Sequence, residues 1–281
     1  MNVTFIGIGA IGLPMALQIK RAGHEVTGVD LSSRACELAR ESGLAAVSSL
    51  AAAPAADVVV AMVATPQQLA SLVESVGTRL DAQTWIIMST VGPDAVREQG
   101  ERLRAAGARV VDAPVTGGTA RARTGQLVIF ASGARTDIDA VRPVLDAMGS
   151  VRVTGASLGD GQAIKVVNQH LCSVHIVAAA EALSLARALG LDPGAVLELV
   201  EKGAAGSWML SDRGPRMLQG TDVTVTSSIN IFVKDSDLVA EAANSCGAHV
   251  PLLAIANARY REAAQEGLGL RDDSRVIETW R

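Results

Sequence analysis

Aromatic residues are scarce in this sequence, where they make up only 2% of 281 residues. A core with so little Phe, Tyr and Trp has to be filled by Ala, Val, Leu and Ile, which suit helices packed closely on a parallel sheet. Hydrophobic residues reach 49% and charged residues 19%, so the composition is globular and excludes a disordered or collagen-like chain. A chain of this length forms one large domain or two of ordinary size, and we expect two.

Cysteine is equally scarce. The three cysteines, Cys36, Cys172 and Cys246, are odd in number and widely spaced, without a CxxC pair or metal-ligand spacing to the four histidines. This usage is typical of a reduced protein, so we expect a cytoplasmic chain without a structural metal.

The sequence also has no excess of positive charge and no targeting segment. It carries 25 Lys and Arg against 29 Asp and Glu, with a net charge of −4, so nucleic acid is not an expected partner. The apolar N-terminal stretch lacks a basic start and a cleavage site, and its glycines and Pro14 interrupt any spanning helix. We therefore expect neither a signal peptide nor a membrane anchor.

Short apolar segments alternate with helical patterns through the first half of the chain, which is typical of βαβ units. The runs VVVAMV and WIIMS are unbroken, as in strands of a parallel sheet that is buried on both faces. We predict a Rossmann-type, doubly wound, mainly parallel sheet over residues 1–158. Strands are expected at 3–6, 25–29, 58–63, 85–89, 108–111, 126–131 and 151–153, and helices at roughly 10–22, 33–42, 66–76, 93–106 and 137–148.

From Gly159 onward only the helical period remains, so residues 159–281 are predicted to form an all-α C-terminal domain. Its first helix, which begins GQAIKVVNQ, keeps apolar residues at helical spacing for about 30 residues. Further helices are expected at 193–203, 207–218, 229–247 and 251–265, from Pro at starts and Gly at stops.

A G-x-G-x-x-G motif, Gly7, Gly9 and Gly12, directly follows the first predicted strand and opens the first helix. In this context Gly7 makes the tight turn, Gly9 lets backbone N–H groups approach a pyrophosphate, and Gly12 allows close packing of helix on strand. Ala10 and Ile11 belong to the same cofactor loop. The alternative is a glycine-rich turn in a sheet that binds no nucleotide.

Asp30 ends the second predicted strand, where a carboxylate binds the adenosine ribose hydroxyls. The same carboxylate would repel the extra phosphate of NADP, so NAD is favoured. Arg34 lies close enough in sequence to compensate in part, and its alternative role is a solvated helix charge.

Thr65 and Thr90 follow two further strands at the carboxyl edge of the sheet, where ligands bind in open α/β folds. They are candidate contacts for the ribose and nicotinamide. Each could instead be a helix N-cap, which is the commoner role of Thr.

Thr116, Gly117 and Gly118 form a turn whose successive N–H groups can hold a substrate carboxylate. Taken alone, a Gly-Gly turn is more often without function. Arg121 and Arg123 follow it, either as substrate contacts or as solvated charges.

Lys165 lies early in the long apolar helix, on a face shared with Asn168 and Gln169. A lysine near apolar surface is a candidate for proton transfer. The alternative is a lysine that extends its ammonium group to solvent.

Four segments together resemble the signature blocks of the β-hydroxyacid dehydrogenase family, in order and across nearly the whole chain: GIGAIGLPMALQIKRAGHEVTGVD, DAPVTGGTARARTGQL, GQAIKVVNQ and FVKDSDL. The resemblance implies an NAD(P)-linked, reversible oxidation of a short hydroxy acid. It further implies that Lys165 is the catalytic acid/base and that Thr116, Gly117 and Gly118 hold the substrate carboxylate. Lys234 would approach the cofactor near the nicotinamide.

Thr116 stands where the family usually has Ser, and one further departure matters more: the general pattern has an asparagine four residues after the lysine, whereas this chain has Gln169. This variant, with His175 beyond it and GSWM at 206–209, resembles the L-threonate dehydrogenase branch and favours a four-carbon sugar acid such as L-threonate. Asn168, Gln169, His175 and Ser207 would then bind the extra hydroxyls. For His175, packing is the alternative role.

Other functions remain open from sequence. Within the family the alternatives are 3-hydroxyisobutyrate dehydrogenase and tartronate semialdehyde reductase. More remote alternatives are an imine-reductase-like enzyme, which Lys165 argues against, and a non-catalytic NAD-binding module. The long apolar helix suggests burial between subunits, so a homodimer or homotetramer is expected.

Overall fold

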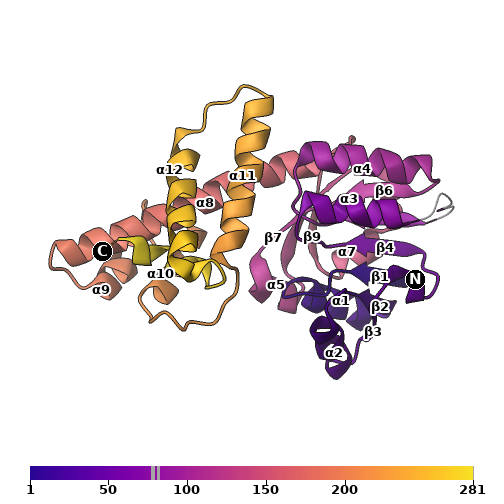
Figure 1. Ribbon diagram of the computed structural model, residues 1–281, viewed down its shortest axis with the longest axis horizontal. Coiled ribbons are helices and arrows are strands. Elements are labelled where there is room, and N and C mark those ends of the chain that lie inside the picture. The colour runs from indigo at the N-terminus through magenta and orange to yellow at the C-terminus, as the bar shows by residue number, and fades with distance from the viewer. Residues whose placement is uncertain (77–79, 81–82, 281) are drawn as a thin grey trace. The chain divides into compact units, whose positions relative to one another are not determined.

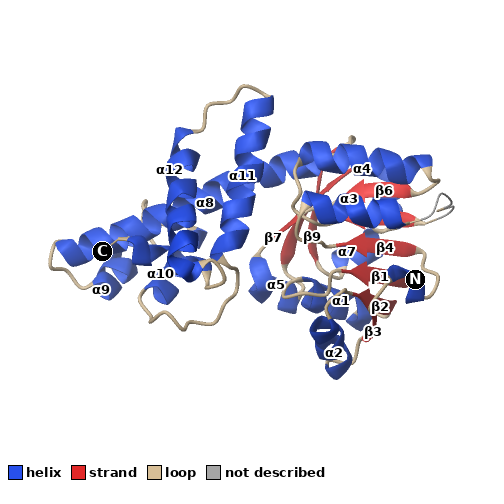
Figure 2. Cartoon of the chain, in the orientation of Figure 1, coloured by secondary structure: helices blue, strands red, loops and turns tan. Residues whose placement is uncertain are grey.

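The chain divides into two compact units, Met1–Lys165 and Val166–Arg281, in the computed structural model, which describes residues 1–76, 80 and 83–280 (Figure 1). We call them unit 1 and unit 2. Strands occur in unit 1, while the described part of unit 2 is built from helices and loops (Figure 2). Helix α8, Asp160–Ala188, begins in unit 1 and continues into unit 2.

Unit 1 is a nine-stranded sheet with helices on both faces. The strands are β1 (Asn2–Ile6), β2 (Glu25–Val29), β3 (Ala45–Val47), β4 (Val58–Ala61), β5 (Thr84–Ile87), β6 (Arg109–Asp112), β7 (Val115–Thr116), β8 (Leu127–Ser132) and β9 (Gly149–Gly155). The helices are α1 (Gly12–Arg21), α2 (Ser33–Glu41), α3 (Pro66–Ser75), α4 (Pro93–Ala105), α5 (Gly118–Thr124), α6 (Arg135–Ala140) and α7 (Arg142–Asp146).

The order of the strands is β3-β2-β1-β4-β5-β6-β8-β7, and β9 pairs with β8. All pairs from β3 to β6 are parallel, and β8 pairs antiparallel with β6 and β7. The chain reverses its direction of travel across the sheet between β1 and β4, the point where open α/β sheets bind ligands. This arrangement confirms the predicted doubly wound, mainly parallel sheet.

The central strands are buried on both faces, as their unbroken apolar runs predicted. All four residues of β4 are buried, and so are all four of β5. Along β4, Val58 and Val60 contribute to a core shared with α1 and α2, whereas Val59 and Ala61 contribute to a core shared with α3 and α4. Because side chains alternate between the faces of a strand, these two cores lie on opposite faces of the sheet.

Several short elements were not predicted from the sequence, among them β3, the 3-10 helix at Leu50–Ala52, the two-residue β7 and α5. They are too short to show a hydrophobic period. The predicted helix at 137–148 is instead two helices, α6 and α7, separated at Val141. Pro143 in the first turn of α7 has no N–H to continue the preceding helix, which accounts for the break.

Unit 2 is all-helical where it is described, as predicted. After α8 come α9 (Pro193–Val200), α10 (Trp208–Met217), α11 (Ile229–Ser245) and α12 (Pro251–Ala263), then a short π-helix at Ala264–Leu268 and a 3-10 helix at Asp273–Thr279. Its core joins Ile176 and Leu183 of α8 to Phe232 and Tyr260, whose rings stack 5.3 Å apart.

Helix α8 is long and apolar enough to cross a membrane by length and composition. However, Ile176, Ala180 and Leu183 are buried in the core of unit 2. A helix that packs one face into a protein core in this way behaves as the central helix of a globular domain.

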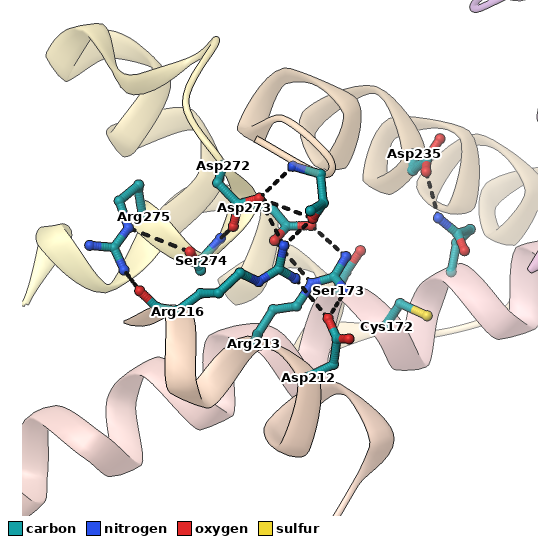
Figure 3. Close-up of polar contacts among 12 residues, drawn as sticks. Cys172, Ser173, Asp212, Arg213, Arg216, Asp235, Asp272, Asp273, Ser274 and Arg275 are labelled. Carbon is teal, nitrogen blue, oxygen red and sulfur yellow. Dashed lines mark hydrogen bonds and ion pairs between the residues drawn. The ribbon is translucent and has the colours of Figure 1, made fainter. Parts of the chain in front are cut away.

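Charged side chains tie the C-terminal segment of unit 2 to α10 (Figure 3). Arg213 donates two hydrogen bonds to the fully buried Asp273, at 3.0 and 2.8 Å. Arg216 donates to Asp272 at 3.0 Å, and Asp212 pairs with both arginines. Burial alone would raise the pKa of Asp272, but the Thr226 N–H, Ser274 and Arg216 hold it below its usual range. The irregular end of the chain is therefore fixed by ion pairs.

Candidate active site

The glycine loop after β1 is shaped by contacts that exclude side chains. Gly7 has φ +89°, and a Cβ there would lie 2.2 Å from the carbonyl oxygen of Met62 at the end of β4. A Cβ on Gly12 would lie 1.9 Å from the carbonyl oxygen of Gly7. Both positions therefore require glycine for the turn and for the packing of α1 on the sheet.

Gly9 differs from both neighbours, because a Cβ there would meet nothing within 4 Å. The N-cap of the adjoining helix is Ile11, with no side-chain cap, and the first turn of α1, all of it described, holds no acidic residue. The space beside Gly9, at the positive dipole end of α1, is thus open. This local chemistry fits the pyrophosphate of a dinucleotide.

Asp30 follows β2 and is half-buried, with Oδ1 accepting the N–H of Ser32 at 2.9 Å. Arg34 forms ion pairs on its own helix with Glu37 at 3.3 Å and Glu41 at 3.9 Å. The guanidinium is therefore engaged with carboxylates of α2.

The two threonines at the sheet edge differ in their local roles. Thr65 is the N-cap of α3, because its Oγ1 accepts the N–H of Gln68 at 3.1 Å. Thr90 lies in the loop between β5 and α4. The preceding residue, Ser89, is fully buried and its Oγ accepts the N–H of Val63 at 2.7 Å, which joins this loop to the one after β4.

A buried polar network, which the sequence analysis missed, connects the start of α8 to two strand ends. Asp112, the last residue of β6, accepts the N–H groups of Gly159 and Gln162, each at 3.1 Å, and the hydroxyl of Ser132 at 3.0 Å. Burial raises the pKa of Asp112 to about 6, against hydrogen bonds from Gln162, Ser132 and Gly159 that lower it. One local signal existed, since Asp112 opens the segment DAPVTGG and Gln162 lies in GQAIK.

Gln162 is the centre of this network and is fully buried. Its Oε1 accepts the N–H groups of Val91 and Gly92, both at 3.1 Å. Its Nε2 donates to the carbonyl oxygen of Ser89 at 2.9 Å and to Oδ1 of Asp112 at 3.1 Å. Lys165 follows one helical turn later and is also buried, with 6% of its surface exposed.

The predicted carboxylate loop has the backbone form that its glycines allow. Thr116 ends β7, and Gly117 and Gly118 have φ values of +131° and +66°. A Cβ on Gly117 would come within 2.9 Å of the Arg121 side chain, whereas Gly118 faces open space.

Three of the predicted residues of unit 2 meet in one cluster between α8 and α11. Gln169 accepts a hydrogen bond from Asn168 at 2.8 Å and donates one to Oδ2 of Asp235. The other carboxylate oxygen of Asp235 pairs with Nζ of Lys234 at 2.8 Å. Asp235 directly follows Lys234 in the segment FVKDSDL, and in the structure it links this lysine to Gln169.

The other two predicted residues of unit 2 have different settings. Ser207 is the N-cap of α10, with its Oγ accepting the N–H of Leu210 at 3.0 Å. His175 lies half-buried on α8. Among the described residues, no group of three or more His, Cys, Asp or Glu side chains is arranged to hold a metal ion.

The sheet and the glycine loop at its reversal point define the class of Rossmann-type dinucleotide-binding proteins. Family comparison agrees with this class. Residues 2–159 match the NAD-binding domain of 6-phosphogluconate dehydrogenase, and residues 159–280 match the model described as NAD-binding of NADP-dependent 3-hydroxyisobutyrate dehydrogenase. The chain belongs to the β-hydroxyacid dehydrogenase family, as its four segments predicted.

Individual relatives are similar over the full length. L-threonate dehydrogenase of Cupriavidus necator is 35% identical, over 99% of this chain and 95% of that protein. A crystal structure of 3-hydroxyisobutyrate dehydrogenase from Salmonella typhimurium is 32% identical, with a TM-score of 0.91 and 99% of both chains covered. A structure of Mycobacterium tuberculosis 3-hydroxyisobutyrate dehydrogenase with L-serine is 30% identical, with a TM-score of 0.84, and covers 100% of this chain and 99% of that one. This protein is thus a hydroxyacid dehydrogenase with an NAD(P)-binding domain and a small-molecule substrate.

Proposed function

We propose that this dehydrogenase oxidises a four-carbon sugar acid such as L-threonate, with NAD as the acceptor and Lys165 as the acid/base. The observation that carries the substrate is Gln169, four residues after Lys165, held between Asn168 and Asp235. A full-length relative with 35% identity that is named L-threonate dehydrogenase supports the same substrate. The alternatives within the family are 3-hydroxyisobutyrate and tartronate semialdehyde.

Two observations support NAD over NADP. The Asp30 carboxylate at the end of β2 would bind ribose hydroxyls and repel a phosphate in their place. Arg34, the residue that could offset this repulsion, is paired with Glu37 and Glu41. We propose that the cofactor is held by Gly7, Gly9, Ala10, Ile11, Gly12, Asp30, Thr65, Thr90 and Lys234. When bound, NAD supplies the hydride-accepting chemistry of the reaction.

The side chain of Lys165 has the chemistry for the proton step. As a neutral amine it would accept the proton of the substrate hydroxyl during oxidation, and as an ammonium it would donate a hydrogen bond to the carbonyl oxygen during reduction. Its burial limits exchange with bulk water.

Substrate binding is assigned to two groups of residues. Thr116, Gly117 and Gly118 would hold the carboxylate through backbone N–H groups, for which the two positive φ values provide the turn. Asn168, Gln169, His175 and Ser207 are proposed to bind hydroxyl groups. A site that hydrogen-bonds hydroxyls discriminates strongly against acids that lack them.

The test is initial-rate NADH formation with a panel of three- to five-carbon hydroxy acids, including L-threonate, 3-hydroxyisobutyrate, glycerate and L-serine, with NAD and with NADP. We expect L-threonate or a close relative to give the highest kcat/KM. Lys165→Ala should lower kcat by about 10²–10⁴-fold, the usual contribution of an acid/base. A higher kcat/KM for 3-hydroxyisobutyrate would refute the substrate, and full turnover by Lys165→Ala would refute the mechanism.

The asparagine of the general family pattern provides a matched variant. Gln169→Asn shortens the side chain by one methylene at the position that carries the substrate assignment. We expect it to lower kcat/KM for L-threonate more than for 3-hydroxyisobutyrate, because only the former offers extra hydroxyls. An equal loss for both acids would show that Gln169 does not select the substrate.

We also propose a cytoplasmic homodimer or homotetramer with functional domains at residues 1–158 and 159–281. Ile164, Val167 and Leu171 support assembly, because they form an apolar stripe on α8 and are each more than two-fifths exposed. Light scattering tests the assembly, and a monomer mass that does not change with concentration would refute it.

A further inference from the structure

We propose that Asp112 and Gln162 are positioning residues for Lys165: together they fix the first turn of α8 to the loop after β5. The role of Lys165 itself rests on the proposed function. All the residues concerned lie within unit 1. Neither Asp112 nor Gln162 is assigned a contact with substrate or cofactor.

The side-chain amide of Gln162 has one permitted orientation. Its Oε1 faces two donors, the N–H groups of Val91 and Gly92, while Nε2 faces two acceptors, the Ser89 carbonyl and Asp112. A flipped amide would oppose donors to donors and acceptors to acceptors at all four contacts. The loop at 89–92 therefore fixes the rotamer of the Gln162 side chain, and the same hydrogen bonds attach the loop to α8.

Asp112 must offer an acceptor on both oxygens. Oδ1 accepts from the fixed Nε2 of Gln162, and Oδ2 accepts from two backbone N–H groups at the start of α8. The first N–H groups of a helix have no partner within the helix, so Asp112 replaces the missing carbonyls. Only a carboxylate has the required oxygen atoms on both arms, since Asn would present a donor on one of them.

The start of α8 packs so closely on β8 that no side chain fits between them at Gly161. A Cβ on Gly161 would lie 2.3 Å from the carbonyl oxygen of Phe130 in β8 and 3.0 Å from Oδ2 of Asp112. The N–H of Gly161 donates to Oγ of Ser132 at 2.9 Å. The start of α8 is thus held at Gly159, Gly161 and Gln162 by side chains from β6 and β8.

Residue 165 lies one turn after residue 162 on the same side of α8, so a shift of the first turn moves Lys165 directly. Reactions that depend on an oriented acid/base lose about 10²-fold in rate when the geometry is displaced by about 1 Å. The anchored first turn prevents that displacement.

The primary test compares Asp112→Asn with Asp160→Asn in the full-length enzyme, using the substrate that the panel identifies. Asp160 is a matched control, because it lies in the same turn, but within the described part of the chain its carboxylate accepts only the N–H of nearby Ser157, at 3.1 Å. We expect Asp112→Asn to lower kcat by about 10–100-fold while KM and the Kd of NADH stay within about threefold, and Asp160→Asn to keep the wild-type kcat.

A complementary double variant separates positioning from general loss of structure. In D112N/Q162E, the amide group of residue 112 can donate to a carboxylate oxygen of residue 162, while the other oxygen still accepts from Val91 and Gly92. Only the contact with the Ser89 carbonyl becomes unfavourable, so the double variant should recover at least about fivefold in kcat over Asp112→Asn. A double variant no faster than Asp112→Asn alone would refute the pairing.

Hydrogen exchange gives a readout that does not depend on activity. Amides at 158–165 and 89–92 should exchange faster in Asp112→Asn, by about tenfold, and at the wild-type rate in Asp160→Asn, where the amide of Ser157 alone loses its side-chain acceptor. Unchanged exchange in Asp112→Asn would refute the anchor, and faster exchange with unchanged kcat would refute its role in positioning Lys165. A wild-type enzyme inactive on the whole panel would refute the proposed function, and exchange would still decide whether the anchor exists.

Discussion

The two units of this protein stabilise buried carboxylates in different ways. Asp112, the one buried carboxylate in the described part of unit 1, has neutral partners: two backbone N–H groups, a hydroxyl and an amide. In unit 2, Asp272 and Asp273 are paired with guanidinium groups of α10. The neutral network of unit 1 sets the direction of a helix start, whereas the ion pairs of unit 2 hold an irregular chain segment.

The difference follows from which polar groups need hydrogen-bond partners in each unit. In unit 1 the sheet ladders pair the backbone groups of the strands, and one buried carboxylate accepts the N–H groups of Gly159 and Gln162 at the start of α8. In unit 2 the chain before α11 and the chain after α12 share backbone hydrogen bonds at a single antiparallel bridge, Ser228 with Asp272. Long arginine side chains reach the carbonyl and carboxylate oxygens of these two segments. Arg275, for example, donates to the carbonyl oxygens of Gln219 and Gly220.

Removing a charge should therefore have its largest effect in unit 2. Arg213→Ala leaves the Asp273 carboxylate buried without its partner, and we expect a loss of about 3–5 kcal/mol in the free energy of unfolding. Arg142→Ala, which removes an exposed pair with Asp146, should lose no more than about 1 kcal/mol. Urea unfolding measures both, and a loss below about 1 kcal/mol for Arg213→Ala would contradict the interpretation of Asp273 as a charge that needs its partner.

The second prediction separates packing from ligand binding in unit 1. Gly7→Ala combines a strained φ with a contact to the Met62 carbonyl, so we expect it to lose about 1–3 kcal/mol or more in stability. Gly9→Ala should leave stability within about 1 kcal/mol but weaken NADH binding by about tenfold or more, because its methyl group enters the space of the pyrophosphate. Thermal unfolding and NADH fluorescence titration measure the two effects. Normal NADH binding by Gly9→Ala would contradict the proposal that this loop binds the pyrophosphate.

The third prediction concerns pH. Because the pKa of Asp112 is raised from 3.8 to about 6, the folded protein keeps a proton that the unfolded chain releases, and stability falls as pH rises through this range. The stability of the wild type relative to Asp112→Asn should fall by about 2 kcal/mol between pH 4.5 and pH 7. Trp85, buried in unit 1, reports this unfolding when Trp208 and Trp280 are both replaced by Phe. A difference independent of pH would mean that Asp112 titrates alike in both states.

Most of the fold was predictable because its main elements are long or strongly apolar. The runs in β4 and β5 and the period of α8 reflect burial on defined faces, which a local pattern records. The domain boundary expected between residues 158 and 159 stays a prediction. The compact units of the structure divide after Lys165, within the continuous helix α8.

The site was less predictable, for a physical reason. The glycine loop is a local motif, and its turn follows from residues close in sequence. The network of Asp112 and Gln162 joins residues far apart in the chain, so no local period shows it. Lys165 drew attention as a polar residue in an apolar helix, yet Gln162 breaks the same pattern and is buried more completely. Thr65 and Ser207, in contrast, were singled out from sequence as ligand contacts, and in the structure both are helix N-caps.

Under the proposed cofactor role of the glycine loop, the uncapped start of α1 would link the lifetime of the protein to its supply of nucleotide. Ile11, the N-cap of α1, has helical φ and ψ and offers no side-chain oxygen to the first N–H groups of the helix. Under the proposed cofactor role of this loop, binding of the dinucleotide supplies the missing partner and shifts the unfolding equilibrium by mass action. Molecules without nucleotide would then be the first to unfold and to be degraded.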